Sequence, residues 1–202
     1  MKKSIPSNHI EWKRANKFFE NYQNKHDVSQ LLRLYTLETP FYDALQQNSD
    51  SFAFKLYSHL LSLGDRAFQG GKTYRSFEMT FDCIYDYEWA NKNKGRIVEV
   101  KTLLSTSASQ TIVDTYTKHA NRSTVMCIFN FPQICYTAID LNVNKSLSTY
   151  AFEKEILILP GTLFEVIDIA EDRSTGRYVL RLENISVSQE IFKKALIDIQ
   201  NL

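Results

Sequence analysis

The chain has 202 residues and a formal net charge of +1, with 24 Lys and Arg against 23 Asp and Glu. This length suits one domain with a substantial core, and the balanced charge excludes a basic surface built for nucleic acid or for an acidic membrane. Aromatic residues make up 13% of the chain, which favours a β-rich core and a pocket lined by rings.

The lysines at the start of the chain are not followed by an apolar segment, so neither a secretory signal peptide nor a membrane-spanning helix is expected. Cys83, Cys127 and Cys135 are odd in number and lack metal-ligand spacing, as do the four histidines. We therefore expect reduced cysteines, with a Cys127–Cys135 bridge across a hairpin as the alternative, no metal, and a cytoplasmic protein or a domain of one.

The first third of the chain is predicted to be helical, because its aromatic and apolar residues recur at helical spacing. Asp27 and Ser29 are candidate caps for the second helix, and Pro40 suits the first turn of the third. Gly64 is expected to end the fourth helix. The expected helices cover residues 10–23, 28–35, a segment starting at 40, and 52–63.

After Gly70 and Gly71 the pattern changes to short alternating segments, which are typical of strands. The expected strands cover 72–78, 96–104, 123–130, 134–141, 155–159, 163–170 and 178–185, with helices over 81–90, 110–119 and 188–199 and a hairpin-like turn over 172–176. Helices first and strands afterwards predict an α+β fold built on a split antiparallel β-sandwich. We treat residues 1–202 as a single domain, with a helical lead-in (1–66), a β-rich core (70–187) and a C-terminal helix (188–202).

The first segment with candidate chemistry is Tyr74-Arg75-Ser76, which follows the paired glycines. A buried arginine in a short strand needs a partner, and its planar fork suits phosphate oxygens. The alternative is an arginine on an edge strand that points to water.

The second segment is Ser105-Thr106-Ser107, in which an apolar strand runs into three consecutive hydroxyls. One of these hydroxyls can cap the helix that follows. Another can hydrogen-bond a carboxylate and hold its rotamer, as the support of an active site requires.

The third segment is Glu153-Lys154-Glu155, directly before the apolar run of residues 156–159. In an extended backbone, carboxylates two residues apart share one face. Such a pair can divide two roles, one stabilising charge near a reacting carbon and the other handling a nucleophile's proton. The alternative is a pair of solvated acids on a strand edge.

Taken in chain order, these three segments resemble the motifs of the arginine–serine–glutamate (R-S-E, ExE) class of mono-ADP-ribosyltransferases. Residues 38–42 look like the helical lead-in of the eukaryotic-type, arginine-specific branch, and residues 155–164 look like its catalytic strand and the following turn. The similarity spans residues 34–185. Ser76 departs from the glycine that many members carry, and the paired cysteines of extracellular members are absent.

The resemblance implies an ADP-ribosyltransferase fold that binds NAD as a consumed substrate and releases nicotinamide. Glu155 would stabilise positive charge at the anomeric carbon in an oxocarbenium-like transition state, with Ser105 orienting it. Arg75 would grip the NAD diphosphate. Glu153 would bind an acceptor arginine and help remove its proton, which makes a protein arginine the expected acceptor.

Neighbours of these residues are expected to make the other contacts with NAD and with the acceptor. Tyr74, Ser76, Thr106 and Ser107 would contact NAD, and Tyr150 and Phe152, in the loop over 144–152, would recognise the acceptor. Two alternatives stay open: an NAD glycohydrolase that uses the same site, and a non-catalytic NAD-fold interaction module. We expect a monomer whose partners are NAD and a protein with an exposed arginine, with no nucleic acid or membrane partner; a delivered bacterial effector is the alternative setting.

Overall fold

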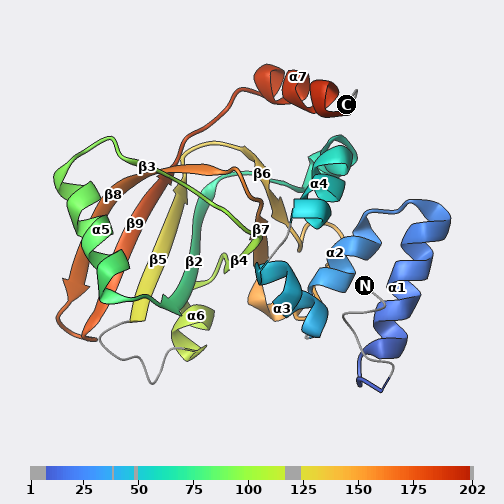
Figure 1. The fold of residues 1–202 in the computed structure, drawn as a ribbon, viewed down its shortest axis with the longest axis horizontal. Coiled ribbons are helices and arrows are strands. Elements are labelled where there is room, and N and C mark those ends of the chain that lie inside the picture. Colours follow the sequence, from blue (N-terminus) through green and yellow to red (C-terminus); the bar gives the residue numbers. More distant parts are fainter. Residues whose placement is uncertain (1–7, 38, 48–49, 117–123, 201–202) are drawn as a thin grey trace.

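The computed structural model describes residues 8–37, 39–47, 50–116 and 124–200. Its helices are α1 (Trp12–Lys25), α2 (Ser29–Tyr35), α3 (Pro40–Gln47), α4 (Asp50–His59), α5 (Phe81–Lys92), α6 (Gln110–Tyr116) and α7 (Gln189–Gln200), with 3-10 helices η1 (Leu60–Arg66) and η2 (Ala151–Glu153) (Figure 1). Its strands are β1 (Ala67–Phe68), β2 (Gly71–Glu78), β3 (Ile97–Glu99), β4 (Leu104–Ser107), β5 (Thr124–Phe131), β6 (Cys135–Asp140), β7 (Glu155–Ile158), β8 (Leu163–Asp172) and β9 (Arg177–Asn184). Among these described helices, none has the length and apolar character that crossing a membrane requires.

The strands form one nine-stranded sheet in the order β1-β6-β7-β4-β2-β5-β9-β8-β3. Strands β2 and β4 are paired only through Tyr74 and Ser107, so this single pair joins the two halves of the sheet. The α+β class with a split sheet is confirmed, with one difference. Strand β9 runs parallel to β5, because the β8–β9 hairpin brings the chain back beside β5 in the same direction.

Two apolar clusters lie on the two faces of β7, as the alternation of strand side chains requires. Leu157 and Leu159 join the cluster formed with α2, α4 and η1. Ile156 and Ile158 join the cluster formed with residues of β5, β8 and β9 and of the neighbouring strands β1 and β6. Glu155 and Leu157 are two residues apart in β7, so their side chains lie on the same face of the strand. The Glu155 side chain is therefore directed to the helical side of the sheet.

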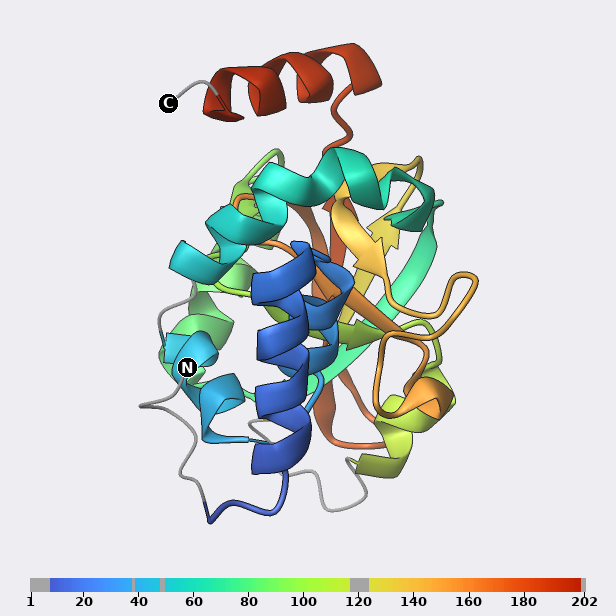
Figure 2. The ribbon, with the colours of Figure 1, turned by 90° about the vertical axis from the view of Figure 1, so that its right-hand side faces the viewer.

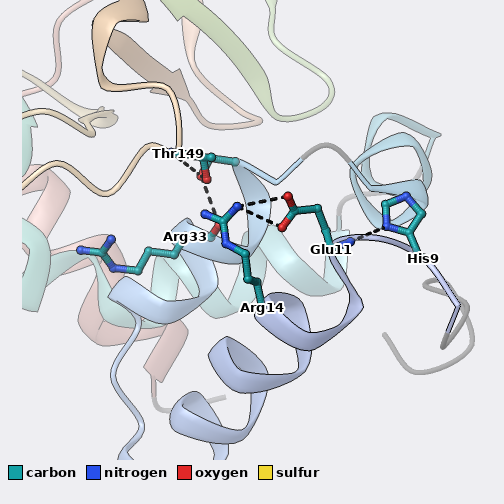
Figure 3. Close-up of polar contacts among 6 residues, drawn as sticks. His9, Glu11, Arg14, Arg33 and Thr149 are labelled. Atoms are coloured by element: carbon teal, nitrogen blue, oxygen red, sulfur yellow. Dashed lines mark hydrogen bonds and ion pairs between the residues drawn. The ribbon is translucent and has the colours of Figure 1, made fainter.

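The N-terminal helices cover this side of the sheet. Helices α1 and α2 lie in front of the strands in Figure 2, α4 crosses above them, and α7 lies outermost. Helix α1 begins with a local polar cluster, in which the backbone N–H of Glu11 donates to His9 Nδ1 at 3.1 Å and Arg14 pairs with the Glu11 carboxylate at 3.0 Å (Figure 3). Pro40 is the first residue of α3, as predicted.

Two sequence-based boundaries are wrong. Gly64 does not end the fourth helix, because α4 ends at His59 and the chain continues through Gly64 as η1. This continuation buries Arg66, whose guanidinium donates to the backbone oxygens of Asp140 and Lys145. The predicted strand over 96–104 is two strands, β3 and β4, which lie in different halves of the sheet. The predicted helix over 110–119 runs to Tyr116, and its last predicted residues lie outside the described part of the chain.

Candidate active site

The three candidate segments lie side by side at the junction of the two half-sheets. Strand β4 is the link: its Ser107 pairs with Tyr74 of β2 on one side and with Glu155 of β7 on the other. Strands β2, β4 and β7 accordingly meet near the centre of the molecule in Figure 1. Residues about 30 and 50 positions apart in sequence are thereby placed within contact distance.

Glu155 is the first residue of β7 and is only 6% exposed. Its two carboxylate oxygens accept hydrogen bonds from two hydroxyls, Ser105 Oγ to Oε1 at 2.7 Å and Ser148 Oγ to Oε2 at 2.9 Å. Burial raises the pKa of Glu155 above its ordinary value, and nearby Glu153 adds to this. The two serine hydroxyls and Arg75 act against the rise in pKa, because they favour the ionised form.

Arg75 is half-buried in β2 on the wall of the same site. Its Nη1 donates to the backbone oxygen of Ser105 at 2.7 Å. Among the described residues no carboxylate lies within ion-pair distance of its guanidinium. A partly desolvated cation without a paired anion is costly, so the remaining N–H groups of Arg75 suit an anionic ligand such as a diphosphate.

Glu153 reaches the site in a different way from the one predicted. It is the last residue of η2 rather than part of a strand, and Lys154 takes a left-handed conformation with φ 49° before β7 begins. The predicted strand does begin at Glu155, but the extended backbone that would place both carboxylates on one face is absent between Glu153 and Glu155. Ser107 Oγ fixes the turn by donating to the backbone oxygen of Glu153, which keeps Glu153 beside Glu155.

Two cavities meet at Ser105, Glu153 and Glu155, which line both. The first, of about 270 Å³, is lined by Tyr74, Arg75, Ser76, Ser105, Thr106, Ser107, Ile112, Val113, Glu153 and Glu155. The second, of about 220 Å³, is lined by Tyr35, Thr36, Leu37, Tyr42, Ser105, Tyr150, Glu153 and Glu155. The first cavity is lined by the Arg75 guanidinium and the hydroxyls of β4, and the second is lined by Tyr35, Tyr42 and Tyr150.

The three hydroxyls of β4 have separate contacts. Ser105 holds Glu155, whereas Thr106 Oγ1 donates to the backbone oxygen of Ile156 at 2.9 Å. Ser107 also accepts from the backbone N–H of Ser109 at 3.0 Å, which satisfies one donor just before α6. Thr106 and Ser107 thus line the first cavity while their hydroxyls bind backbone groups.

Of the two residues expected to recognise the acceptor, the structure places one on a cavity wall. Tyr150 lines the second cavity, and its ring meets that of Phe152 edge to face with centroids 6.1 Å apart. Phe152 itself is 62% exposed and lies outside both cavity walls that the described residues form.

Sequence reasoning placed Ser148 in the substrate-recognition loop without a contact to Glu155, missed Tyr35 and assigned no role to Tyr42. Ser148 lies in a loop rich in hydroxyls before η2, but no local pattern marks which hydroxyl reaches Glu155. Tyr35 and Tyr42 read as members of a helical core, and Tyr35 is indeed fully buried, which raises the pKa of its hydroxyl well above the ordinary value. Within the described ranges, no three His, Cys, Asp or Glu side chains gather as a metal site would require.

We predict that Glu155→Gln raises the free energy of unfolding at neutral pH. The pKa of Glu155 is raised above 4.5 in the folded state, so its contribution to stability is full below 4.5 and is lost as the pH rises through the raised pKa. Glutamine carries no charge and avoids this loss. Urea unfolding at pH 4 and pH 7.5 measures this free energy. The variant should be more stable than the wild type mainly at pH 7.5. An equal difference between variant and wild type at both pH values would contradict the prediction.

No protein-family model matches the sequence, and no curated protein matches it. Solved structures do match in fold. The ADP-ribosyltransferase HopU1 of Pseudomonas syringae pv. tomato DC3000 is 15% identical, with a TM-score of 0.59 over 86% of this chain and 83% of that one. An ADP-ribosyltransferase from Clostridium botulinum is 10% identical, with a TM-score of 0.58 over 89% of this chain and 97% of that one.

A third similar structure is that of the ADP-ribosyltransferase Vis from Vibrio splendidus, in complex with agmatine. It is 16% identical to this chain, with a TM-score of 0.50 over 93% of this chain and 80% of that one. The chain therefore has the fold of the ADP-ribosyltransferases, and the neighbours named here come from bacteria.

Proposed function

We propose that the protein is a mono-ADP-ribosyltransferase that moves ADP-ribose from NAD to a guanidinium group of a protein arginine. The observation that carries this proposal is the buried Glu155 carboxylate, held at both oxygens by serines and facing a cavity that also contains Arg75. A fold shared with ADP-ribosyltransferases supports it.

In the proposed reaction NAD occupies the site as a substrate, with its diphosphate on the available N–H groups of Arg75. The bond between the nicotinamide nitrogen and C1′ of the ribose breaks, and its electron pair leaves with neutral nicotinamide. Glu155 accepts a hydrogen bond from a ribose hydroxyl and stabilises the positive charge that develops at C1′. Such stabilisation by one well-placed group contributes about 3–4 kcal/mol.

The acceptor nucleophile then forms a new bond to C1′, and it must lose a proton. A guanidinium is cationic at neutral pH, so it needs a carboxylate that binds it and receives this proton. Glu153 lies on both cavities, and the second cavity is lined by the partly exposed Tyr42 and Tyr150, whose rings suit a planar cation. The complex of Vis with agmatine, which carries a guanidinium group, supports an acceptor of this chemistry.

The transfer is tested by incubating the protein with NAD labelled on its adenosine, together with agmatine or a cell lysate. Label on agmatine and on lysate proteins is the expected result. Label that appears only as free ADP-ribose would favour the NAD glycohydrolase instead, and no nicotinamide release at all would favour a non-catalytic module. The eukaryotic-type branch, the monomeric state and the cytoplasmic location stay predictions from the sequence.

We predict that Arg75→Lys raises the KM for NAD by about tenfold or more, with a smaller effect on kcat. Lysine keeps the charge, but it cannot bind the Ser105 carbonyl and a diphosphate together through a planar fork. Steady-state kinetics of nicotinamide release measure both constants. Arg181→Lys is a matched control, because Arg181 lies on β9 and pairs with Asp168 at the surface. Equal KM values for wild type and Arg75→Lys would remove Arg75 from the binding of NAD.

A further inference from the structure

Ser148 makes a contact with Glu155 that complements the one made by Ser105. It is only 8% exposed, and its Oγ lies 2.9 Å from Glu155 Oε2. Ser148 Oγ also accepts a hydrogen bond from the backbone N–H of Tyr150 at 3.2 Å. A serine hydroxyl has one proton to donate, so the Tyr150 contact leaves that proton directed at the Glu155 carboxylate.

The loop that carries Ser148 is fixed on both sides of this residue. Leu147 is buried in the helical-side cluster, and its backbone N–H donates to the oxygen of Leu141 at 2.7 Å. On the other side, the backbone N–H of Thr149 donates to Thr36 Oγ1 at 3.1 Å. The hydroxyl oxygens of Thr36 and Thr149 are also 3.2 Å apart.

Two residues in or directly after helix α2 bind this loop. Thr36 follows the last residue of α2, and the guanidinium of Arg33 donates to the backbone oxygen of Ser146 at 3.2 Å. Figure 3 shows Arg33 and Thr149 on neighbouring segments at this contact between helix and loop. Thr36 is buried, so its hydrogen bond with the backbone N–H of Thr149 is partly shielded from solvent.

We propose that Ser148 is a positioning residue for Glu155, and that α2 holds it in place through Thr36 and the 146–149 loop. This inference rests on the proposed function, in which Glu155 must be ionised and correctly oriented when nicotinamide leaves. Two hydroxyls on separate segments donate to the two oxygens of the Glu155 carboxylate. One hydrogen bond alone would let the carboxylate group rotate about it, and the second hydrogen bond restricts this rotation. Hydrogen bonds to the charged form also keep a buried carboxylate ionised.

The charged and titratable groups that act on Glu155 come from three other elements. Arg75 of β2 favours the ionised form, Glu153 of η2 opposes it, and the hydroxyl of Tyr35 from α2 interacts with it electrostatically. Ser148→Ala alters none of these groups. Its effect on the titration of Glu155 can therefore be assigned to the lost hydroxyl.

The test is a titration of Glu155 by ¹³C NMR of its side-chain carboxyl, assigned by comparison with Glu155→Gln, in parallel with the pH profile of nicotinamide release. In Ser148→Ala the midpoint is expected to move to higher pH, and the acid limb of kcat should move with it. At pH 6 kcat should fall about tenfold, with little change in the KM for NAD. Ser148→Thr, which keeps the hydroxyl, should restore the wild-type midpoint.

Ser62→Ala is the matched control, since it removes an exposed serine hydroxyl that donates to the backbone oxygen of His59, outside both cavities and the 146–149 loop. Thr36→Val tests the attachment to α2 from a distance, and it carries the test if Ser148→Ala fails to fold; it should move the midpoint in the same direction. An unchanged midpoint in Ser148→Ala, or an equal change in Ser62→Ala, would overturn the proposal. The NMR titration needs no turnover, so it decides the role of Ser148 even if the wild type releases no nicotinamide and the proposed function fails.

Discussion

Replacing Glu155 with Gln is expected to lower the rate of nicotinamide release from NAD by on the order of a hundredfold to a thousandfold. The substitution keeps the size of the side chain and an acceptor for Ser105, but it removes the charge that faces the proposed position of C1′. The loss should appear in kcat and in kcat/KM alike, because the charge acts chiefly as the glycosidic bond breaks. Release of nicotinamide, followed by chromatography over a range of NAD concentrations, measures it.

Glu171→Gln is the control for this experiment, since Glu171 is an exposed carboxylate on β8 outside both cavities. It should behave as the wild type. The expected gain in stability of Glu155→Gln provides a second control, because a variant that is better folded and less active has lost chemistry rather than structure. Nicotinamide release by Glu155→Gln at the wild-type rate would refute the mechanism.

Glu153→Gln is expected to separate the two halves of the proposed reaction. Transfer to agmatine should fall by on the order of a hundredfold, because glutamine cannot take a proton from a guanidinium. Hydrolysis of NAD should keep most of its rate, since water needs less help and Glu155 still stabilises the charge at C1′. Both products come from one reaction mixture, in which labelled ADP-ribosyl agmatine is compared with free ADP-ribose.

The ratio of the two products is the informative quantity for Glu153. If both fall together, Glu153 contributes to the breaking of the glycosidic bond itself. If neither falls, other groups bind the guanidinium and receive its proton, and the role proposed for Glu153 fails. Phe152→Ala should change transfer to agmatine by less than about twofold, because the ring is 62% exposed and outside both cavities.

Most element types followed from local patterns in the sequence. The aromatic stripes predicted α1, α2 and α4, and alternation predicted the core strands from β5 to β9. The errors lie where long-range contacts override local patterns. Gly64 continues a 3-10 turn because Arg66 beyond it is bound to two backbone oxygens, and the segment 96–104 divides because its two ends pair with strands in different halves of the sheet.

In the candidate site, too, some residues could be predicted from the sequence and others depend on long-range contacts. Arg75, Ser105 and Glu155 could be chosen from the sequence, because the three segments that contain them, taken in chain order, resemble the motifs of the arginine–serine–glutamate class. Ser148 could not be chosen, because its role depends on a loop that is fixed by Thr36, more than a hundred residues earlier in the chain. The conformation of Glu153 was also out of reach, since the left-handed Lys154 replaces the extended backbone that its neighbours suggested.

The side chains available for chemistry and the segments that alternate as strands can be identified in the chain alone. Composition and periodicity depend on neighbouring residues, which the sequence displays. Which hydroxyls reach the carboxylate, and how deeply it is buried, follow instead from the folded arrangement. Sheet pairing at Tyr74, Ser107 and Glu155 and the attachment of a loop to α2 set those distances. Hydrogen bonds and burial act over a few ångströms in space, so they depend on contacts that no local pattern specifies.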